Sequence, residues 1–295
     1  MPDTEQLSRF ENGRGFIAAL DQSGGSTPGA LRLYGIEDSA YSSDAEMFDL
    51  IHAERVRIIT SPAFTSEHIL GTILFENTLE RSIDGRGVAD YLWHGKGIVP
   101  FLKIDKGLQD EADGVQLMRD IPGLDGLLAK ARSAGVLGTK ERSVIHSADE
   151  AGIRRVVSQQ FELAEKVLAA DLLPIMEPEV SIKAPDKAEA EALLKAAILE
   201  RLDAIGEHKV AVKITIPTVD DFYADLIAHP RTARVVALSG GYSRDEADAL
   251  LARNHGLIAS FSRGLLQGLS AQQSDAQFDA TLTGSIESIY RASVT

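Results

Sequence analysis

Lys213 is the residue whose surroundings point most directly to chemistry. It lies in the run KVAVKITI, among apolar and β-branched residues that predict a buried strand. An unpaired charge is costly to bury, so desolvation and a neighbouring cation such as Lys140 would favour the uncharged amine. An uncharged lysine amine can attack a ketone and form a Schiff base. The structural alternative is a buried ion pair between Lys213 and either Glu177 or Glu179.

Carboxylates in two other segments could move the protons that such a reaction requires. Asp21 follows the apolar run FIAAL, and Glu177 lies in PIMEPE, and we expect these two residues to act as acid and base. Glu179 should face the same way as Glu177, because side chains in a strand alternate with a period of two. A supporting role for Glu179, holding a nearby cation, fits equally well. The same period places Lys140 and Arg142 of TKER on one face.

Two glycine-rich turns predict sites for phosphate groups. Each runs from a predicted strand toward a predicted helix, which exposes backbone N–H groups to an anion. The first turn is DQSGGSTPG at 21–29, and its hydroxyl groups belong to Ser23 and Ser26. The second turn consists of Ser239, Gly240 and Gly241. Further phosphate or substrate contacts are expected from Lys103, Arg142, Glu179, Ser262 and Arg263. Together these residues predict a ligand with two phosphates.

Strands and helices alternate along the chain and must position these residues. We predict eight strands, at 15–21, 69–75, 98–105, 136–142, 172–179, 209–216, 235–240 and 257–262. Amphipathic helices are predicted between strands, among them 149–170, 187–205, 245–254 and 275–292. This alternation favours a parallel sheet closed into an α/β (β/α)8 (TIM) barrel of one domain, 1–295, over an open doubly wound sheet. The active site of such a barrel lies at the carboxyl ends of the strands, where the residues above fall.

Composition narrows the class of ligand and the cellular setting. A formal net charge of −14 argues against a surface for nucleic acid or an anionic membrane. The N-terminus lacks a secretory pattern, no run approaches the roughly 20 apolar residues of a membrane span, and cysteine is absent, which together favour the cytoplasm. The seven histidines form no ligand pair at helix or strand spacing, so we expect no metal and no other cofactor.

Eight motifs follow one another along nearly the whole chain: AALDQSGGSTP, GTILFENTLER, FLKIDKG, GTKER, PIMEPE, VKITIPT, LSGGYS and ASFSRGL. In these motifs the chain resembles the class I fructose-1,6-bisphosphate aldolases, particularly their short bacterial form. The resemblance implies a glycolytic lyase that cleaves fructose 1,6-bisphosphate reversibly to dihydroxyacetone phosphate and glyceraldehyde 3-phosphate. Small-molecule sugar phosphates would be its partners. Oligomers are common in the family, so a homo-oligomer stays open.

The resemblance also implies roles for individual residues. Lys213 would form the Schiff base, Glu177 would act as acid and base around the carbinolamine, and Asp21 would assist cleavage of the carbon–carbon bond. Lys140 and Arg142 would bear on the nucleophile and on the charge of the substrate. The implied phosphate contacts are Ser239, Gly240 and Arg263 for the 1-phosphate, and Lys103, Ser23 and Ser26 for the 6-phosphate.

The chain departs from the animal members of the family at several places. Gln22 stands where they have glutamate, SRGLLQ replaces their GRALQ near the last strand, and their C-terminal tyrosine has no counterpart. The group that protonates the enamine is therefore not implied. Two rival hypotheses remain. One is another Schiff-base barrel aldolase, of the transaldolase type, acting on a single phosphate. The other is a barrel that binds a sugar phosphate or a protein without turnover.

Overall fold

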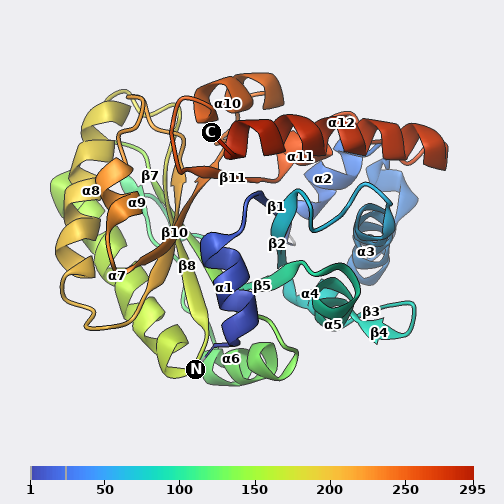
Figure 1. Cartoon of the computed structure of the whole chain (residues 1–295), viewed down its shortest axis with the longest axis horizontal. Helices are drawn as coiled ribbons and strands as arrows, with labels where there is room; N and C mark the ends of the chain where they lie inside the picture. The colour runs from blue at the N-terminus through green and yellow to red at the C-terminus, as the bar shows by residue number, and fades with distance from the viewer. Residues whose placement is uncertain (1, 24) are drawn as a thin grey trace.

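Residues 2–23 and 25–295 are described by the computed structural model, and among them eight parallel strands form a closed barrel (Figure 1). Each strand pairs with the next one around the ring, and the last strand pairs with the first. The strands in order around the barrel are β1 (Phe16–Leu20), β2 (Ile69–Leu74), β5 (Val99–Lys103), β7 (Gly138–Ile145), β8 (Leu173–Val180), β9 (Val210–Thr215), β10 (Thr232–Leu238) and β11 (Ile258–Phe261). The predicted (β/α)8 barrel is confirmed.

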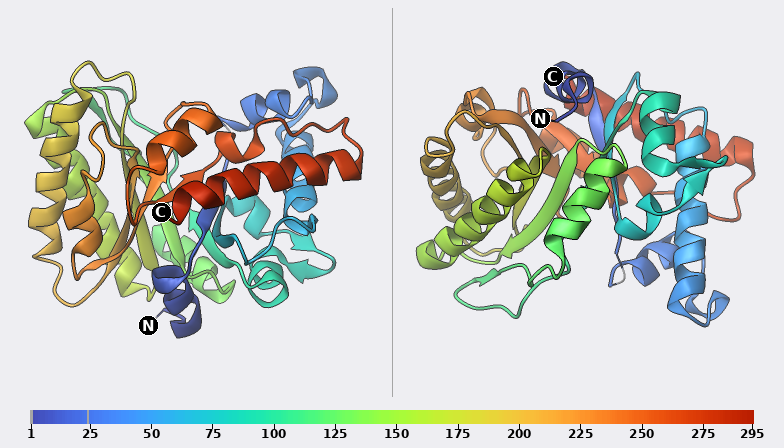
Figure 2. Two further views of the ribbon diagram at one scale, coloured as in Figure 1. Left: turned by 45° about the horizontal axis from the view of Figure 1, so that its top comes forward. Right: turned by 90° about the horizontal axis from the view of Figure 1, so that it is seen from below.

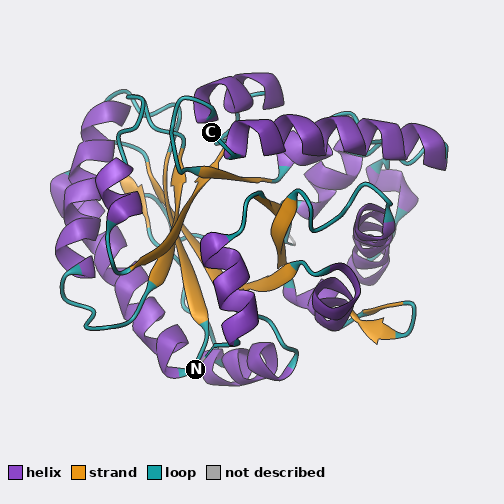
Figure 3. Cartoon of the chain, viewed as in Figure 1, coloured by secondary structure: helices purple, strands orange, loops and turns teal. Residues whose placement is uncertain are grey.

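Helices cover the outside of this ring of strands, as Figures 2 and 3 show. The larger ones are α2 (Thr27–Leu33), α3 (Asp44–Thr60), α6 (Leu124–Ser133), α7 (Glu150–Ala169), α8 (Lys187–Leu202), α10 (Arg244–Leu251) and α12 (Asp275–Ser293). Shorter helical pieces are η1 (Asp38–Ala40), α4 (Glu76–Leu79), α5 (Val88–Asp90), η2 (Tyr91–Gly95), α9 (Ala224–Ala228) and α11 (Arg263–Leu266). A hairpin of β3 (Ser82–Ile83) and β4 (Arg86–Gly87) stands apart from the barrel. No helix in the described part of the chain is long and apolar enough to cross a membrane.

An extra helix, α1 (Thr4–Asn12), closes the amino-terminal end of the barrel. Asp3 caps this helix by accepting hydrogen bonds from the backbone N–H groups of Glu5 and Gln6. Its Phe10 is fully buried and packs against Phe101 of β5, with ring centroids 5.0 Å apart. The same buried cluster contains the inward-facing residues Ile17, Val99, Ile175, Ala211 and Val236. The amino-terminal half of the barrel is therefore a filled apolar core, and polar inward-facing residues gather at the carboxyl end.

Two of the predicted strand boundaries are wrong by several residues. The strand predicted to end at 142 continues to Ile145, because its last residues pair with β8 on one side and with β6 (Val115–Gln116) on the other. Lys140 and Arg142 therefore lie within the strand and not at its end. The strand predicted at 235–240 begins at Thr232 and ends at Leu238. It ends early because Gly240 has a φ of 62° and Gly241 a φ of 120°, outside the extended region.

Candidate active site

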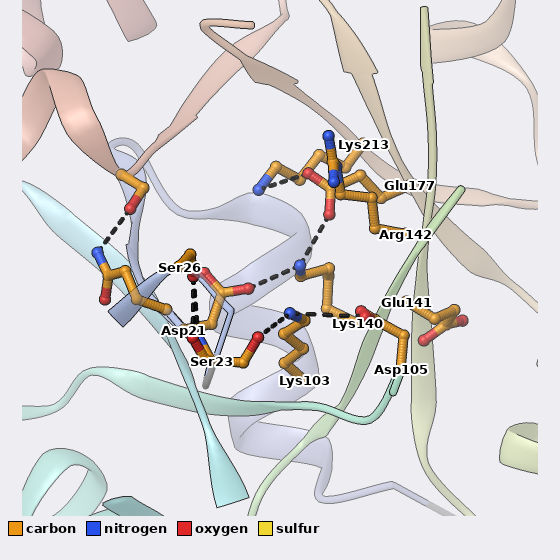
Figure 4. A network of polar contacts seen from close by, with 12 residues as sticks. Asp21, Ser23, Ser26, Lys103, Asp105, Lys140, Glu141, Arg142, Glu177 and Lys213 are labelled. Atoms are coloured by element: carbon orange, nitrogen blue, oxygen red, sulfur yellow. Dashed lines mark hydrogen bonds and ion pairs between the residues drawn. The ribbon is translucent and has the colours of Figure 1, made fainter. Parts of the chain in front are cut away.

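Four charged side chains from four different strands meet at the carboxyl end of the barrel (Figure 4). Asp21 follows β1, Lys140 lies on β7, Glu177 on β8 and Lys213 on β9, and each is less than 10% exposed. Strand periodicity places them there, since Glu177 lies two residues beyond the inward-facing Ile175 and Lys213 two residues beyond the inward-facing Ala211. We call Asp21, Lys140, Glu177 and Lys213 the charge cluster.

Ion pairs join all members of the charge cluster in one chain. The Nζ atom of Lys140 lies 2.6 Å from Oδ2 of Asp21 and 2.8 Å from Oε2 of Glu177. The other carboxylate oxygen of Glu177, Oε1, lies 3.0 Å from Nζ of Lys213. Glu177 therefore bridges the two lysines, and Lys140 bridges the two carboxylates. Two buried cations face two buried anions, which is the arrangement that makes the burial of each charge tolerable.

The cluster strongly shifts the pKa values of its carboxylates. Burial alone would raise the pKa of Asp21, but the charges of Lys140, Lys213 and Lys103 outweigh burial and hold it well below the ordinary value. Burial likewise opposes the two lysines at Glu177, and the lysines lower the pKa of that carboxyl to about 2. At Lys140 burial would lower the pKa, but Asp21 and Glu177 raise it well above the ordinary value. At neutral pH the resting site therefore holds the Lys140 cation between two carboxylate anions.

Lys213 occupies the position expected of a nucleophile, although it is not unpaired. It forms the ion pair with Glu177 that the sequence left as the structural alternative. Lys140 lies near it, as expected, because both lysines contact the same carboxylate. The positive charge of Lys140 is already balanced by Asp21 and Glu177. A proton can pass between Lys213 and Glu177 within their short contact, so the pairing is compatible with nucleophilic attack.

Next to the cluster, the turn after β1 comes close to the end of β5. Nζ of Lys103 donates a hydrogen bond to Oγ of Ser23 at 2.9 Å and lies 3.5 Å from Oδ1 of Asp105. Ser26 closes the turn on itself, since its Oγ accepts from the N–H of Ser23 at 3.1 Å and donates to the carbonyl of Ser23 at 3.2 Å. The predicted group of Lys103, Ser23 and Ser26 is therefore assembled in space. It offers one cation and two hydroxyls to an anion.

Arg142 lies beyond the charge cluster on the same face of β7 and is partly exposed. Its Nε donates to Oε2 of Glu179 at 2.5 Å, so Glu179 holds a cation, which is the supporting role that the sequence allowed for it. The Arg142 side chain is 38% exposed, whereas that of Lys140 is only 3% exposed. The guanidinium can therefore meet a ligand at the mouth of the barrel.

The second glycine-rich turn lies across the barrel mouth, after β10. Gly240 and Gly241 have positive φ values, and a Cβ atom built on Gly241 would lie 3.7 Å from Nη2 of Arg263. The guanidinium of Arg263 therefore lies beside this turn. Ser262, just before Arg263, accepts a hydrogen bond of 2.8 Å from Nε2 of Gln22. In the described residues, no hydrogen bond or ion pair joins Ser239, Gly240 or Gly241 to the charge cluster.

Comparison with known proteins identifies the family. The family model described as glycolytic fructose-bisphosphate aldolase class-I matches residues 8–220. The chain belongs to this family. Because the match spans β1 to β9, all four members of the charge cluster of this class I aldolase lie within the matched residues.

Three curated class I aldolases resemble the chain over nearly its whole length. Each is a fructose-bisphosphate aldolase class 1. The protein of Porphyromonas gingivalis is 57% identical over 290 residues, which cover 98% of this chain and 99% of that protein. The protein of Synechocystis is 56% identical over 295 residues, covering 100% and 98%. The protein of Clostridium acetobutylicum is 56% identical over 291 residues, covering 98% and 99%.

A solved structure supports the barrel fold of this class I aldolase chain. It is the fructose-bisphosphate aldolase of Plasmodium falciparum, in a ternary complex with TRAP and a small-molecule inhibitor. The TM-score is 0.77 at 21% sequence identity, and the match covers 99% of this chain and 94% of that one. At this identity the likeness shows the fold only.

Several buried polar residues near the aldolase site were missed from the sequence. Glu141 lies between Lys140 and Arg142 but on the opposite face of β7, and it is fully buried. Burial raises its pKa to about 8, and Oγ1 of Thr139 donates a hydrogen bond to it. The signal for such a residue is its position in a strand buried on both faces, because a charge on the outward face is then covered by helices. Arg55 of α3 is also only 1% exposed, and its place on the apolar stripe with Ile51 and Ile58 is the signal that could have shown its burial. In the described part of the chain, no group of three or more His, Asp or Glu residues is arranged to hold a metal ion.

Proposed function

We propose that the chain cleaves fructose 1,6-bisphosphate reversibly to dihydroxyacetone phosphate and glyceraldehyde 3-phosphate through a Schiff base on Lys213. The observation that carries this proposal is the buried amine of Lys213, which lies 3.0 Å from the carboxylate of Glu177 at the carboxyl end of a class I aldolase barrel. A buried amine with a proton acceptor in contact is what imine formation requires. The relatives named above are fructose-bisphosphate aldolases, which favours this function over a transaldolase type.

Imine formation uses the contact between Lys213 and Glu177. Glu177 takes a proton from Lys213, and the freed amine adds to the keto carbon C2. Glu177 then returns a proton to the C2 hydroxyl, which leaves as water and gives the iminium. Because the lysines hold the pKa of Glu177 at about 2, Glu177 carries a proton only transiently, within this contact. Both transfers are therefore expected to occur directly between these neighbouring groups.

Cleavage uses the carboxylate on the other side of Lys140. The iminium withdraws the electron pair of the C3–C4 bond as that bond breaks, and Asp21 accepts the proton of the C4 hydroxyl. Glyceraldehyde 3-phosphate leaves, and an enamine remains on Lys213. Protonation at C3 and hydrolysis then release dihydroxyacetone phosphate and restore the amine. Lys140 keeps Asp21 ionised and ready to accept this proton.

The two phosphates are proposed to lie at opposite sides of the barrel mouth. The turn of Ser239, Gly240 and Gly241 would hold the 1-phosphate together with Ser262 and Arg263. Lys103, Ser23 and Ser26 would hold the 6-phosphate, and Arg142, held by Glu179, would meet the sugar between them. With this function we propose a sugar phosphate as ligand, one catalytic domain over 1–295, no cofactor and a cytoplasmic setting.

Trapping the imine tests the proposal. The protein is incubated with dihydroxyacetone phosphate and a chelator, reduced with borohydride and mapped by mass spectrometry. We expect one adduct, on Lys213, and we expect none in K213M. K209M is the matched control, because Lys209 lies just before the same strand and pairs with Glu11 outside the site. Absence of an adduct together with activity that the chelator abolishes would overturn the Schiff-base mechanism.

A further inference from the structure

Arg55 is a fully buried arginine that lies outside the proposed machinery. It is on α3, it is only 1% exposed, and among the described residues it forms no ion pair. A guanidinium is always charged and has five donors to satisfy, so its burial needs a strong compensating set of hydrogen bonds. The residues that accept these hydrogen bonds show what Arg55 holds in place.

The hydrogen bonds of Arg55 converge on the turn that follows Asp21. Its Nη2 donates to the backbone carbonyl of Gln22 at 2.6 Å and to Oε1 of the same residue at 3.2 Å. Its Nη1 donates to Oγ1 of Thr78, a fully buried residue of α4, at 2.5 Å. Arg55 therefore ties the carbonyl of Gln22, the residue after Asp21, to two helices outside the barrel.

Gln22 extends this connection across the mouth of the barrel. Its Nε2 donates to Oγ of Ser262 at 2.8 Å, and Ser262 directly precedes Arg263. The side-chain amide of Gln22 thus accepts from Arg55 through its oxygen and donates to Ser262 through its nitrogen. This polar chain links α3, the end of β1 and the end of β11. It runs from the residue after the proposed base, Asp21, to Ser262 of the proposed 1-phosphate site.

We infer that Arg55 is a positioning residue that fixes the Asp21 carboxylate for carbon–carbon cleavage by holding the carbonyl of Gln22. The inference rests on the proposed function. The direction of the Asp21 side chain is set by the backbone on both sides of it, and β1 fixes only the preceding side. Arg55 fixes the following side. The charges of Arg55 and Asp21 also attract each other, which further favours a position of Asp21 close to Arg55.

The inference predicts a selective defect. Imine formation needs Lys213 and Glu177, neither of which contacts Arg55, whereas cleavage needs Asp21. In R55M we therefore expect kcat for cleavage to fall about 10- to 100-fold, as for a misplaced catalytic group. Trapping of dihydroxyacetone phosphate on Lys213 should stay within about threefold of wild type. R55K replaces the guanidinium, whose two Nη atoms both donate hydrogen bonds, with a single ammonium group, and it should recover part of kcat.

R57M is the matched control. Arg57 lies on the same helix and binds the carbonyl of Gln273 at 2.6 Å and the carboxylate of Asp275 at 3.0 Å, both outside the site. Its loss is expected to affect stability without changing kcat.

The outcomes separate the two proposals. If wild type forms no adduct, the proposed function fails. If wild type forms the adduct and R55M keeps wild-type kcat, the inference about Arg55 fails. Equal losses of trapping and cleavage in R55M would show a general structural role and would also overturn it. If R55M does not fold, R55K provides the test. Wild-type kcat in R55K would show that the hydrogen bonds of the guanidinium to Gln22 are not needed, and would overturn the inference.

Discussion

The ammonium of Lys140 lies 2.6 Å from the carboxylate of Asp21, and neither side chain is more than 11% exposed. Asp21 and Glu177 both have a lowered pKa in the folded protein, Glu177 at about 2. Carboxyls of this kind add stability above their unfolded pKa near 4, and that stability is lost as the pH falls through the folded pKa. The stability that Lys140 provides therefore depends on the ionised state of both carboxylates.

Replacing Lys140 with methionine should expose this dependence. At pH 7 the free energy of unfolding of K140M should be about 3–5 kcal/mol lower, because two buried carboxylates lose their common partner. The deficit should shrink as the pH falls from about 4.5 toward 2, where wild type also loses its ionised carboxylates. Urea unfolding across this pH range measures it, with K130M as a partly exposed control. A deficit independent of pH would contradict this account. Cleavage should fall by about 100-fold or more.

The buried carboxyl of Glu141 should give stability the opposite dependence on pH. Burial raises its pKa to about 8, so the folded protein keeps this carboxyl protonated while the unfolded chain loses the proton near pH 4.5. The contribution of Glu141 to the free energy of unfolding is largest below about pH 4.5 and declines as the pH rises toward 8. E141Q should therefore melt close to wild type at pH 5 and higher than wild type at pH 8. E5Q, on the exposed face of α1, should show no such divergence.

Gly240 should be needed for affinity more than for the chemical step. An alanine there would have a φ of +62°, and its Cβ atom would lie 2.7 Å from Cγ2 of Ile182. The shifted turn should raise the KM for fructose 1,6-bisphosphate by about tenfold, which corresponds to about 1.4 kcal/mol of binding. G206A is the control, since Gly206 has a φ of +69° but no atom near its Cβ position. An equal rise of KM in both variants would refute the phosphate role of the turn.

Substitution of Lys103 tests whether the enzyme recognises two phosphates or only one. K103M should raise the KM for fructose 1,6-bisphosphate about tenfold or more, because a charged hydrogen bond to the 6-phosphate is lost. The KM for fructose 1-phosphate should change little. K106M is the control, as Lys106 is exposed and pairs with Glu76. Equal changes for both substrates would favour the single-phosphate hypothesis.

The charge cluster could be predicted because strand periodicity and barrel geometry act together. In a parallel barrel every strand ends at the same rim, so polar residues at the ends of apolar strands must converge. This places Glu177 and Lys213 correctly, even though the exact ends of two strands were misjudged. Strand ends are hard to predict because neighbouring strands determine them. β7, for example, continues past Arg142 only because β6 and β8 offer partners there.

The contacts of Arg55 could not have been predicted in the same way. In α3 it falls on the apolar stripe with Met47, Ile51 and Ile58, so its helical spacing indicates burial but not its partners. Only the packing of this helix against the turn after β1 and against Thr78 shows which groups it binds. The ion pair between Lys213 and Glu177 is similar, since a sequence shows that charges converge but not which of them pair.

Closure of the barrel joins the beginning of the chain to its end. Ile17 of β1 is in register with Ser260 of β11, so this seam cannot form until almost the entire chain has left the ribosome. The strands that carry or precede Asp21, Lys140, Glu177 and Lys213 can associate earlier through β2 and β5, but only as an open sheet. Closure by the last strand is what shields these charges from water, which makes completion of the active site one of the final events of folding.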